Sequence, residues 1–218
     1  GGTPSLMEPF NMRKIIEECK KHFPNTEYVK NIEITMEANP SSIFNKSLKE
    51  FYYSGINRIS MGVQSLEPNL LKFLNRIHSS EQIFETYNNA RSAGFENINC
   101  DLIYSIPGQT WKVWEHNLKS VINLEPNHIS AYTLTLEKGT ELYQMVNNNQ
   151  VSMPRDSKTA EWFLKTHEIL NSAVGSYSPS IYFKKTEYFI NQGYIFDQAI
   201  IFLDVSDIFD ELYIQFDK

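Results

Sequence analysis

The sequence has few of the features that mark secreted, membrane-bound or nucleic-acid-binding proteins. Its two cysteines, Cys19 and Cys100, are too few for a disulfide framework or a self-contained metal site, and they fit a reducing compartment. No apolar run approaches the roughly 20 residues that a membrane-spanning helix needs. The net charge is −6 and basic residues never cluster beyond a pair, so no nucleic-acid surface is expected. With these classes excluded, the composition is that of an ordinary soluble globular protein.

The sequence does contain a repeated alternation of strand-like and helix-like segments. Strands are predicted to begin near residues 31, 57, 97 and 128, and each is followed by a helical pattern. Such a series of βα units indicates an α/β protein with a parallel sheet and helices outside it, as a doubly wound sheet or as a barrel. The helices are predicted over residues 9–22, 45–54, 68–76, 80–92, 110–123 and 155–173.

Local signals mark several of the helix ends. Gly55 and Gly94 stand where a helix commonly stops with a left-handed residue. Ser79, with Gln82 three residues later, is typical of a capping box at a helix start.

Polar residues stand late in the predicted strands or just beyond them. Glu37, Gln64 and Asp101 each follow or interrupt an apolar strand pattern, and the loop Gly1-Gly2-Thr3 precedes the first helix. Because ligands of parallel α/β proteins meet the carboxyl ends of the strands, we expect a ligand site there. Taken singly, Asp101 would more often pair with a neighbouring backbone group or arginine, and Gln64 would more often be a satisfied loop amide.

These residue types indicate what the site would bind. Glycines that open a helix suit an anionic or carboxylate group, and the acceptors on the strands suit ribose hydroxyls or an amino group. Arg76 can grip a carboxylate with two parallel hydrogen bonds, although a lone arginine more often forms a weak surface ion pair. An amino-acid nucleoside meets this description. His78 has no His or Cys nearby at metal-ligand spacing, so we expect it to cap a helix or join an ion pair.

Six motifs follow one another along residues 1–170. They are GGTPS (1–5), EITMEANP (33–40), NRISMGVQS (57–65), NRIH (75–78), NCDLIYSIPGQT (99–110) and HISAYTLTLEKGT (128–140). In this order they resemble the radical S-adenosylmethionine (radical SAM) core of the oxygen-independent coproporphyrinogen III oxidase family. The likeness is greatest to the haem-chaperone branch of that family.

The resemblance implies a fold, a ligand and a set of binding residues. The fold would be a partial (β/α)6 TIM-like barrel whose first strand and cluster loop are missing from this chain. S-adenosylmethionine would be the bound nucleoside, and the family's [4Fe–4S] cluster is held by a CxxxCxxC loop. By this resemblance the methionyl amine would meet Gly1, Gly2 and Thr3, the ligand's polar groups Glu37 and Gln64, its carboxylate Arg76, and its ribose region Asp101.

The sequence departs from that family in three respects. The CxxxCxxC loop belongs upstream of Gly1, and the two distant cysteines cannot replace it, so the chain alone is expected to be inactive and no catalytic or metal-binding residue is assigned. We expect a partial radical SAM core over residues 1–174, whereas residues 175–218, rich in aromatic and acidic residues, resemble nothing in the family. Asn75 and Ser105 stand where the family usually has glycine.

The resemblance predicts a fragment of a haem-chaperone-like protein that acts in haem or porphyrin metabolism in the cytoplasm. Its expected partners are S-adenosylmethionine, haem or porphyrin, and haem-acceptor proteins. Two alternatives stay open, an oxygen-independent coproporphyrinogen III dehydrogenase and an inactive remnant without a ligand. The five histidines, His22, His78, His116, His128 and His167, are equal candidates for a haem ligand.

Overall fold

The computed structural model describes residues 4–22, 32–43, 45–174, 180–184, 201–203 and 213–214. The chain forms two compact units, Gly1–Cys100 and Asp101–Lys218. Each unit is an alternation of helices and strands. The expected boundary near residue 174, between a radical SAM core and a C-terminal tail, stays a prediction.

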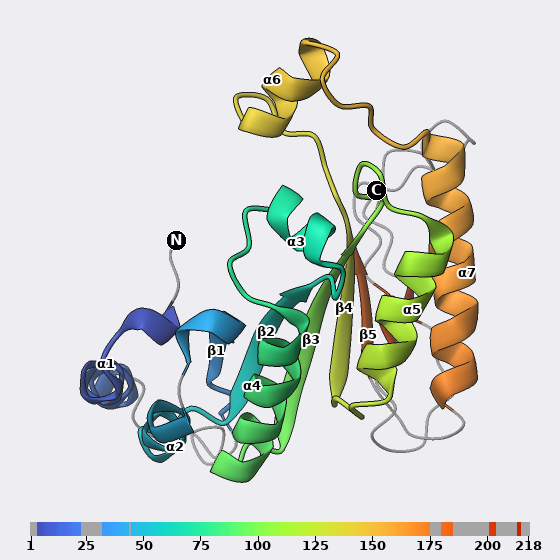
Figure 1. The fold of residues 1–218 in the computed structure, drawn as a ribbon. Coiled ribbons are helices and arrows are strands. Elements are labelled where there is room, and N and C mark those ends of the chain that lie inside the picture. The colour runs from blue at the N-terminus through green and yellow to red at the C-terminus, as the bar shows by residue number, and fades with distance from the viewer. Residues whose placement is uncertain are drawn as a thin grey trace. The chain divides into compact units, whose positions relative to one another are not determined.

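The first unit has its strands beside one another and its helices beside the strands (Figure 1). β1 (Thr35–Ala38) pairs in parallel with β2 (Arg58–Gln64), and β3 (Asn97–Tyr104), which continues into the second unit, comes next in the strand order. Its helical elements are η1 (Pro4–Leu6), α1 (Pro9–His22), η3 (Pro40–Ser42), α2 (Asn45–Tyr53), α3 (Pro68–Phe73) and α4 (Ser80–Ala93).

Strand β2 separates an apolar face from a polar one. Ile59, Met61 and Val63 are at most 1% exposed, whereas the residues between them are half-buried. Burying a side chain of this size contributes about 1.5–3 kcal/mol, so this alternation fixes which face of β2 turns to the helices. The opposite face carries Arg58, Ser60, Gly62 and Gln64.

The second unit begins in the middle of β3 and continues the parallel pattern. β4 (His128–Thr133) pairs in parallel with β5 (Ser180–Lys184), and β6 (Ile201–Leu203) and β7 (Tyr213–Ile214) are added in antiparallel pairs. α5 and α7 lie side by side, and α6 reaches away from the strands of its unit (Figure 1). The helices are α5 (Trp111–Ile122), α6 (Glu141–Asn147) and α7 (Asp156–Val174).

Trp114 organises the core of the second unit. Its ring is fully buried and lies 5.2 Å from the ring of Tyr104. Its indole Nε1 donates a 2.7 Å hydrogen bond to Oγ1 of Thr166, which in turn donates to the carbonyl of Trp162. The helix pair α5 and α7 is therefore joined by a buried polar contact as well as by apolar packing.

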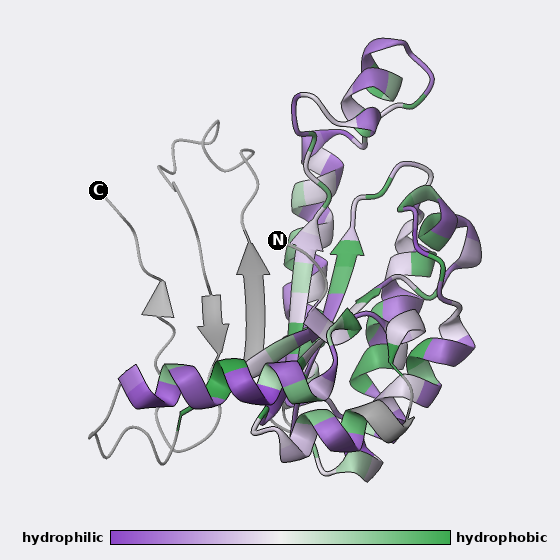
Figure 2. Cartoon of the chain, turned by 90° about the vertical axis from the view of Figure 1, so that its left-hand side faces the viewer, coloured by the Kyte–Doolittle hydropathy of each residue, from purple (hydrophilic) through white to green (hydrophobic). Residues whose placement is uncertain are grey.

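The structure confirms the predicted α/β fold with its parallel strands, and it corrects several element bounds. The first strand begins at Thr35 rather than near residue 31, and the helix predicted over residues 68–76 ends at Phe73. The sequence pattern did not predict α6 or the strands in the C-terminal segment. Among the described helices, none is long and apolar enough to cross a membrane. Figure 2 shows mostly hydrophilic residues along α1, the helix in front, whose buried residue is Ile16.

Candidate functional site

Glu37 lies near the carboxyl end of β1 on its exposed face. Its neighbours Met36 and Ala38 are buried, and the strand register pairs Glu37 with Ser60 of β2. Within the described part of the chain, its carboxylate makes no hydrogen bond or ion pair. An acceptor that is exposed at a strand end and has no partner there is suited to bind a ligand from solvent.

Gln64 ends β2 in a turn that few residue types adopt. Its φ is +64°, and the amide of Ser65 donates a 2.8 Å hydrogen bond to the carbonyl of Val63. These two features define a γ-turn with positive φ at its centre, which is rare and strained. Ser65 is fully buried and its Oγ accepts from the amide of Glu67, so the turn is held on its C-terminal side.

Gly62 gives the Gln64 amide the room it occupies. A Cβ atom at Gly62 would lie 2.9 Å from Nε2 of Gln64, which is closer than carbon and nitrogen atoms normally approach. The side chain of Gln64 therefore folds back along its own strand, over the polar face of β2. Within the described residues, no hydrogen bond holds this amide.

Arg76 is placed by the way α3 ends. The amide of Arg76 donates to the carbonyl of Leu71 and that of Asn75 to the carbonyl of Lys72, with Asn75 at φ +54°. This pair of bonds is a Schellman motif with a left-handed residue at its centre. Arg76, the last residue of the motif, is exposed, and in the described structure its guanidinium makes no hydrogen bond or ion pair.

His78, two residues later, points inward and joins the ends of two strands. It is 4% exposed, with Nδ1 3.2 Å from Oδ1 of Asn39 and Nε2 3.3 Å from the carbonyl oxygen of Val63. Burial lowers its pKa, the hydrogen bond to Val63 opposes that shift, and the nearby charge of Arg76 lowers the pKa further. The expected capping or ion-pair role for His78 is therefore wrong, because both ring nitrogens bridge oxygens at strand ends.

Hydrogen bonds also hold the residues that follow β1. Oδ1 of Asn39 accepts from both the amide and the hydroxyl of Ser41, which caps η3. Thr86 of α4 donates to the buried carbonyl of Pro40, and the hydroxyl of Ser42 lies 3.1 Å from that of Ser5. The segment that follows Thr3 in sequence is thus joined to the carboxyl end of β1.

The remaining expected site residues lie either outside the described residues or in the second unit. Gly1, Gly2 and Thr3 lie outside the described residues. Asp101 is half-buried on β3 and opens the second unit. Strand periodicity sets it on the same face of β3 as Asn99, which donates a 2.8 Å hydrogen bond to Ser60. Glu37, Gln64 and Arg76 all belong to the first unit.

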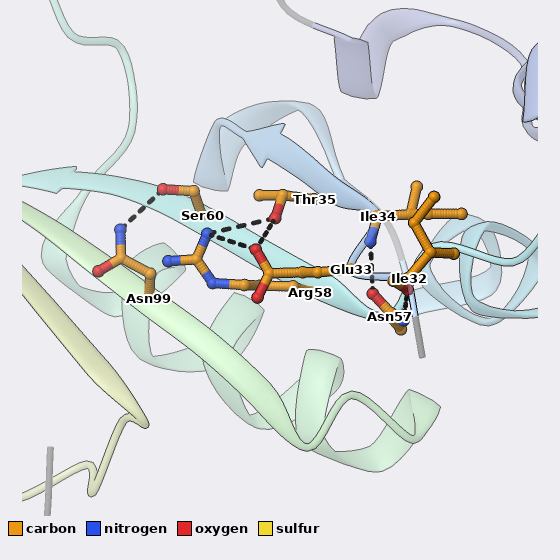
Figure 3. A network of polar contacts seen from close by, with 8 residues as sticks. All are labelled: Ile32, Glu33, Ile34, Thr35, Asn57, Arg58, Ser60 and Asn99. Atoms are coloured by element: carbon orange, nitrogen blue, oxygen red, sulfur yellow. Dashed lines mark hydrogen bonds and ion pairs between the residues drawn. The ribbon is translucent and has the colours of Figure 1, made fainter. Parts of the chain in front are cut away.

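A polar network that the sequence did not predict lies at the opposite end of β1 and β2 (Figure 3). Arg58 donates to Thr35 at 3.2 Å and forms a 3.6 Å ion pair with Glu33, which also accepts from Thr35. The side chain of Asn57 bonds the amide of Ile34 and the carbonyl of Ile32. These groups satisfy one another, so the network fixes the start of the two strands rather than awaiting a ligand.

The fold is that of a parallel α/β protein, with exposed polar side chains at or beyond the carboxyl ends of its strands. Residues 1–121 match the family model described as the radical SAM superfamily. The chain belongs to that superfamily, and the α/β fold of radical SAM type expected from the sequence is confirmed.

Curated relatives narrow the likeness further. The chain is 32% identical over 163 residues to the haem chaperone HemW of Bacillus subtilis, a match covering 75% of this chain and 42% of that protein. It is 34% identical over 173 residues to the mitochondrial radical S-adenosyl methionine domain-containing protein 1 of Danio rerio, covering 79% and 38% respectively. The chain thus spans less than half the length of these relatives.

A solved structure gives the corresponding spatial match. Coproporphyrinogen III oxidase (HemN) from Escherichia coli, a radical SAM enzyme, superposes with a TM-score of 0.66 at 26% identity. The match covers 79% of this chain and 39% of that one. The archaeal Elp3 of Methanocaldococcus infernus has a TM-score of 0.63 at 17% identity, which supports the fold alone.

Proposed function

We propose that this chain is the S-adenosylmethionine-binding part of a haem-chaperone-like protein that acts in haem or porphyrin metabolism. The observation that carries the proposal is the set of three polar side chains, Glu37, Gln64 and Arg76, that lie at or beyond the carboxyl ends of β1 and β2 without partners in the described structure. Membership of the radical SAM superfamily and similarity to HemW support it.

Each group has a chemical role in this proposal. The guanidinium of Arg76 binds the carboxylate of the ligand, and Glu37 and Gln64 accept from or donate to its polar groups. Asp101 binds the ribose region, and Gly1, Gly2 and Thr3 meet the methionyl amine. A hydrogen bond to a charged group contributes about 1.5–3 kcal/mol, so the loss of any one charged contact should be measurable.

The residues of this chain do not fit an iron–sulfur cluster. Cys19 is exposed on α1 and Cys100 is buried in β3, whereas a cluster needs several thiolates close together. Among the described residues, no group of three or more His, Cys, Asp or Glu could hold a metal ion. We therefore assign no catalytic residue, and we expect the chain alone to bind S-adenosylmethionine without cleaving it.

Haem or a porphyrin is the second proposed ligand, with haem-acceptor proteins as partners. This part of the proposal rests on the HemW relatives, which are named haem chaperones. Among the candidate histidines, both ring nitrogens of His78 are already engaged, whereas His116 is exposed. A cytoplasmic location stays a prediction, since one group of relatives is mitochondrial.

The likeness to HemN supports one alternative, an oxygen-independent coproporphyrinogen III dehydrogenase. Product analysis on a full-length protein that contains this chain separates the two functions. A dehydrogenase converts coproporphyrinogen III by loss of two propionate carboxyl groups, whereas a chaperone binds haem and yields no such product. The other alternative, a remnant without a ligand, predicts that neither S-adenosylmethionine nor haem binds.

Calorimetric titration with S-adenosylmethionine tests the proposed site. The wild-type chain should bind, and Glu37→Gln should weaken binding about tenfold, which corresponds to about 1.4 kcal/mol. Glu33→Gln is the matched control, because it changes the same residue type at the other end of β1. Equal loss in both variants, or no binding by the wild type, would overturn the proposal. After incubation with iron, sulfide and a reductant, the chain should release no 5′-deoxyadenosine.

A further inference from the structure

We infer that His78 is a positioning residue for the proposed nucleoside site, because it holds the carboxyl ends of β1 and β2 at a fixed spacing. It does so through Asn39 at the end of one strand and the Val63 carbonyl at the end of the other. This inference rests on the proposed function, in which Glu37 and Gln64 contact the ligand from those same two strands.

The two oxygens that His78 meets lie at the ends of two paired strands. Asn39 follows Ala38, the last residue of β1, and stands two residues after Glu37. Val63 directly precedes Gln64, the last residue of β2. The imidazole ring therefore lies between a side-chain oxygen two residues after Glu37 and the backbone carbonyl directly before Gln64.

The backbone at Gln64 is strained. Its positive φ is costly for a residue with a Cβ, and such a turn persists only where its surroundings hold it. The carbonyl of Val63 that closes the turn accepts from the amide of Ser65 and meets Nε2 of His78. The ring thereby adds a second contact to the carbonyl that closes the turn, and so helps to fix the direction in which the Gln64 side chain leaves the strand.

On both sides, the groups that His78 contacts also take part in other hydrogen bonds. Oδ1 of Asn39 also accepts from the amide of Ser41, so this amide group cannot rotate without loss of its cap on η3. The buried hydroxyl of Thr86 holds the neighbouring carbonyl of Pro40. Because its partners on both sides are held, the ring fixes the positions of the two strand ends and does not only fill space.

The position of Arg76 adds to this arrangement. It stands two residues before His78 on the same segment, with its side chain exposed whereas that of His78 is buried. Fixing His78 against β1 and β2 therefore also limits where the guanidinium of Arg76 can reach. All three proposed ligand contacts of the first unit then depend on one imidazole.

Two substitutions separate the two bonds of the ring. The terminal amide nitrogen of glutamine can take the place of Nε2, and that of asparagine the place of Nδ1. His78→Gln should keep the bond to Val63 and lose the bond to Asn39, whereas His78→Asn should do the reverse. His78→Ala loses both, and His116→Ala on the exposed side of α5 is the control.

The experiment measures amide hydrogen exchange by NMR and S-adenosylmethionine affinity on the same variants. We expect His78→Ala to speed exchange at the Ser65 and Ser41 amides at least tenfold, and to weaken binding at least tenfold. His78→Gln should restore protection at Ser65 alone, and His78→Asn at Ser41 alone. His116→Ala should change neither quantity, and the Phe95 amide at the end of α4 should exchange normally in every variant.

Two results would overturn the inference. In the first, exchange at Ser65 and Ser41 in His78→Ala stays within twofold of the wild type. In the second, exchange rises there but the dissociation constant stays within twofold, which leaves the ring a stabilising role only. If the wild type binds no S-adenosylmethionine, the proposed function fails, and the exchange pattern alone decides whether His78 holds the two strand ends. If His78→Ala does not fold, the Gln and Asn variants decide the matter by the same criteria.

Discussion

Nδ1 of His78 lies 3.2 Å from Oδ1 of Asn39, so that a residue beyond α3 is joined to the first residue after β1. That oxygen already accepts a backbone hydrogen bond, and the other ring nitrogen also faces an oxygen acceptor. A neutral imidazole has one N–H group and an imidazolium has two. Only the protonated ring can donate to both oxygens, so these contacts favour the charged form of His78, whereas burial favours the neutral form.

Acid should weaken the fold over a pH range set by this histidine. Burial, opposed by the Val63 hydrogen bond and assisted by the charge of Arg76, lowers the pKa of His78 below 6.5. The folded state then binds fewer protons than the unfolded state, so the stabilisation is complete above pH 6.5 and is lost as the pH falls through the folded pKa. Urea unfolding at a series of pH values between about 8 and 5 measures the loss.

The control for this prediction is a second histidine. His78→Gln should flatten the pH dependence across that range, and His116→Gln, at an exposed histidine of α5, is the matched comparison. A His78→Gln chain with the slope of the wild type would show that another group titrates there.

Asn75 should respond favourably to glycine. Its φ of +54° at the end of α3 is a conformation that glycine adopts without steric cost. Asn75→Gly should raise the free energy of unfolding by up to about 1 kcal/mol, and Asn75→Val should lower it by about 1–2 kcal/mol. Asn88→Gly, within α4, should have the opposite sign and lower stability by about 0.5–1 kcal/mol. Chemical denaturation measures all three, and a destabilised Asn75→Gly would contradict the reasoning.

Thr166 should be more important for stability than its size suggests. Its hydroxyl accepts from the buried indole of Trp114 at 2.7 Å and donates to the carbonyl of Trp162. Thr166→Val keeps the shape but leaves a buried N–H unpaired, which costs about 1–3 kcal/mol. Ser172→Ala removes an exposed hydroxyl that bonds the Glu168 carbonyl in the same helix and should change stability by less than about 0.5 kcal/mol. A thermal shift of equal size in both variants would refute the prediction.

Gly62→Ala should damage binding more than folding. The new Cβ would meet the movable end of the Gln64 side chain at 2.9 Å rather than backbone, so the amide can swing away at small cost to the fold. S-adenosylmethionine affinity should fall severalfold, while the unfolding midpoint stays near that of the wild type. In a Gln64→Ala background the same substitution should have no further effect on affinity. An additive loss in the double variant would mean that Gly62 acts through another group.

The sequence predicted the parts of this protein that depend on local pattern. The alternation over Arg58–Gln64 has one register that buries Ile59, Met61 and Val63, so the strand could be predicted from the pattern alone. The capping box of Ser79 and Gln82 formed as expected because both partners lie within one helical turn. The positions of Glu37 and Gln64 at strand ends followed from the same periodicity.

The features that the sequence did not reveal depend on distant partners. The first strand starts late because the side chain of Asn57 bonds the amide of Ile34 and the carbonyl of Ile32, where pairing would otherwise begin. The role of His78 depends on partners that lie 39 and 15 residues away in sequence. The γ-turn at Gln64 carries no glycine to mark it, and α6 is too short for its periodicity to be distinctive.

The most direct test of the proposed site removes the carboxylate from the ligand and the guanidinium from the chain. Calorimetry would compare S-adenosylmethionine with its decarboxylated analogue on the wild type, on Arg76→Ala and on the control Arg155→Ala, an exposed arginine of the second unit. We expect at least tenfold weaker binding of the analogue by the wild type and by Arg155→Ala, and equal affinity for both ligands in Arg76→Ala. If Arg76→Ala still distinguishes the ligands as the wild type does, Arg76 does not bind the carboxylate and the proposed site is wrong.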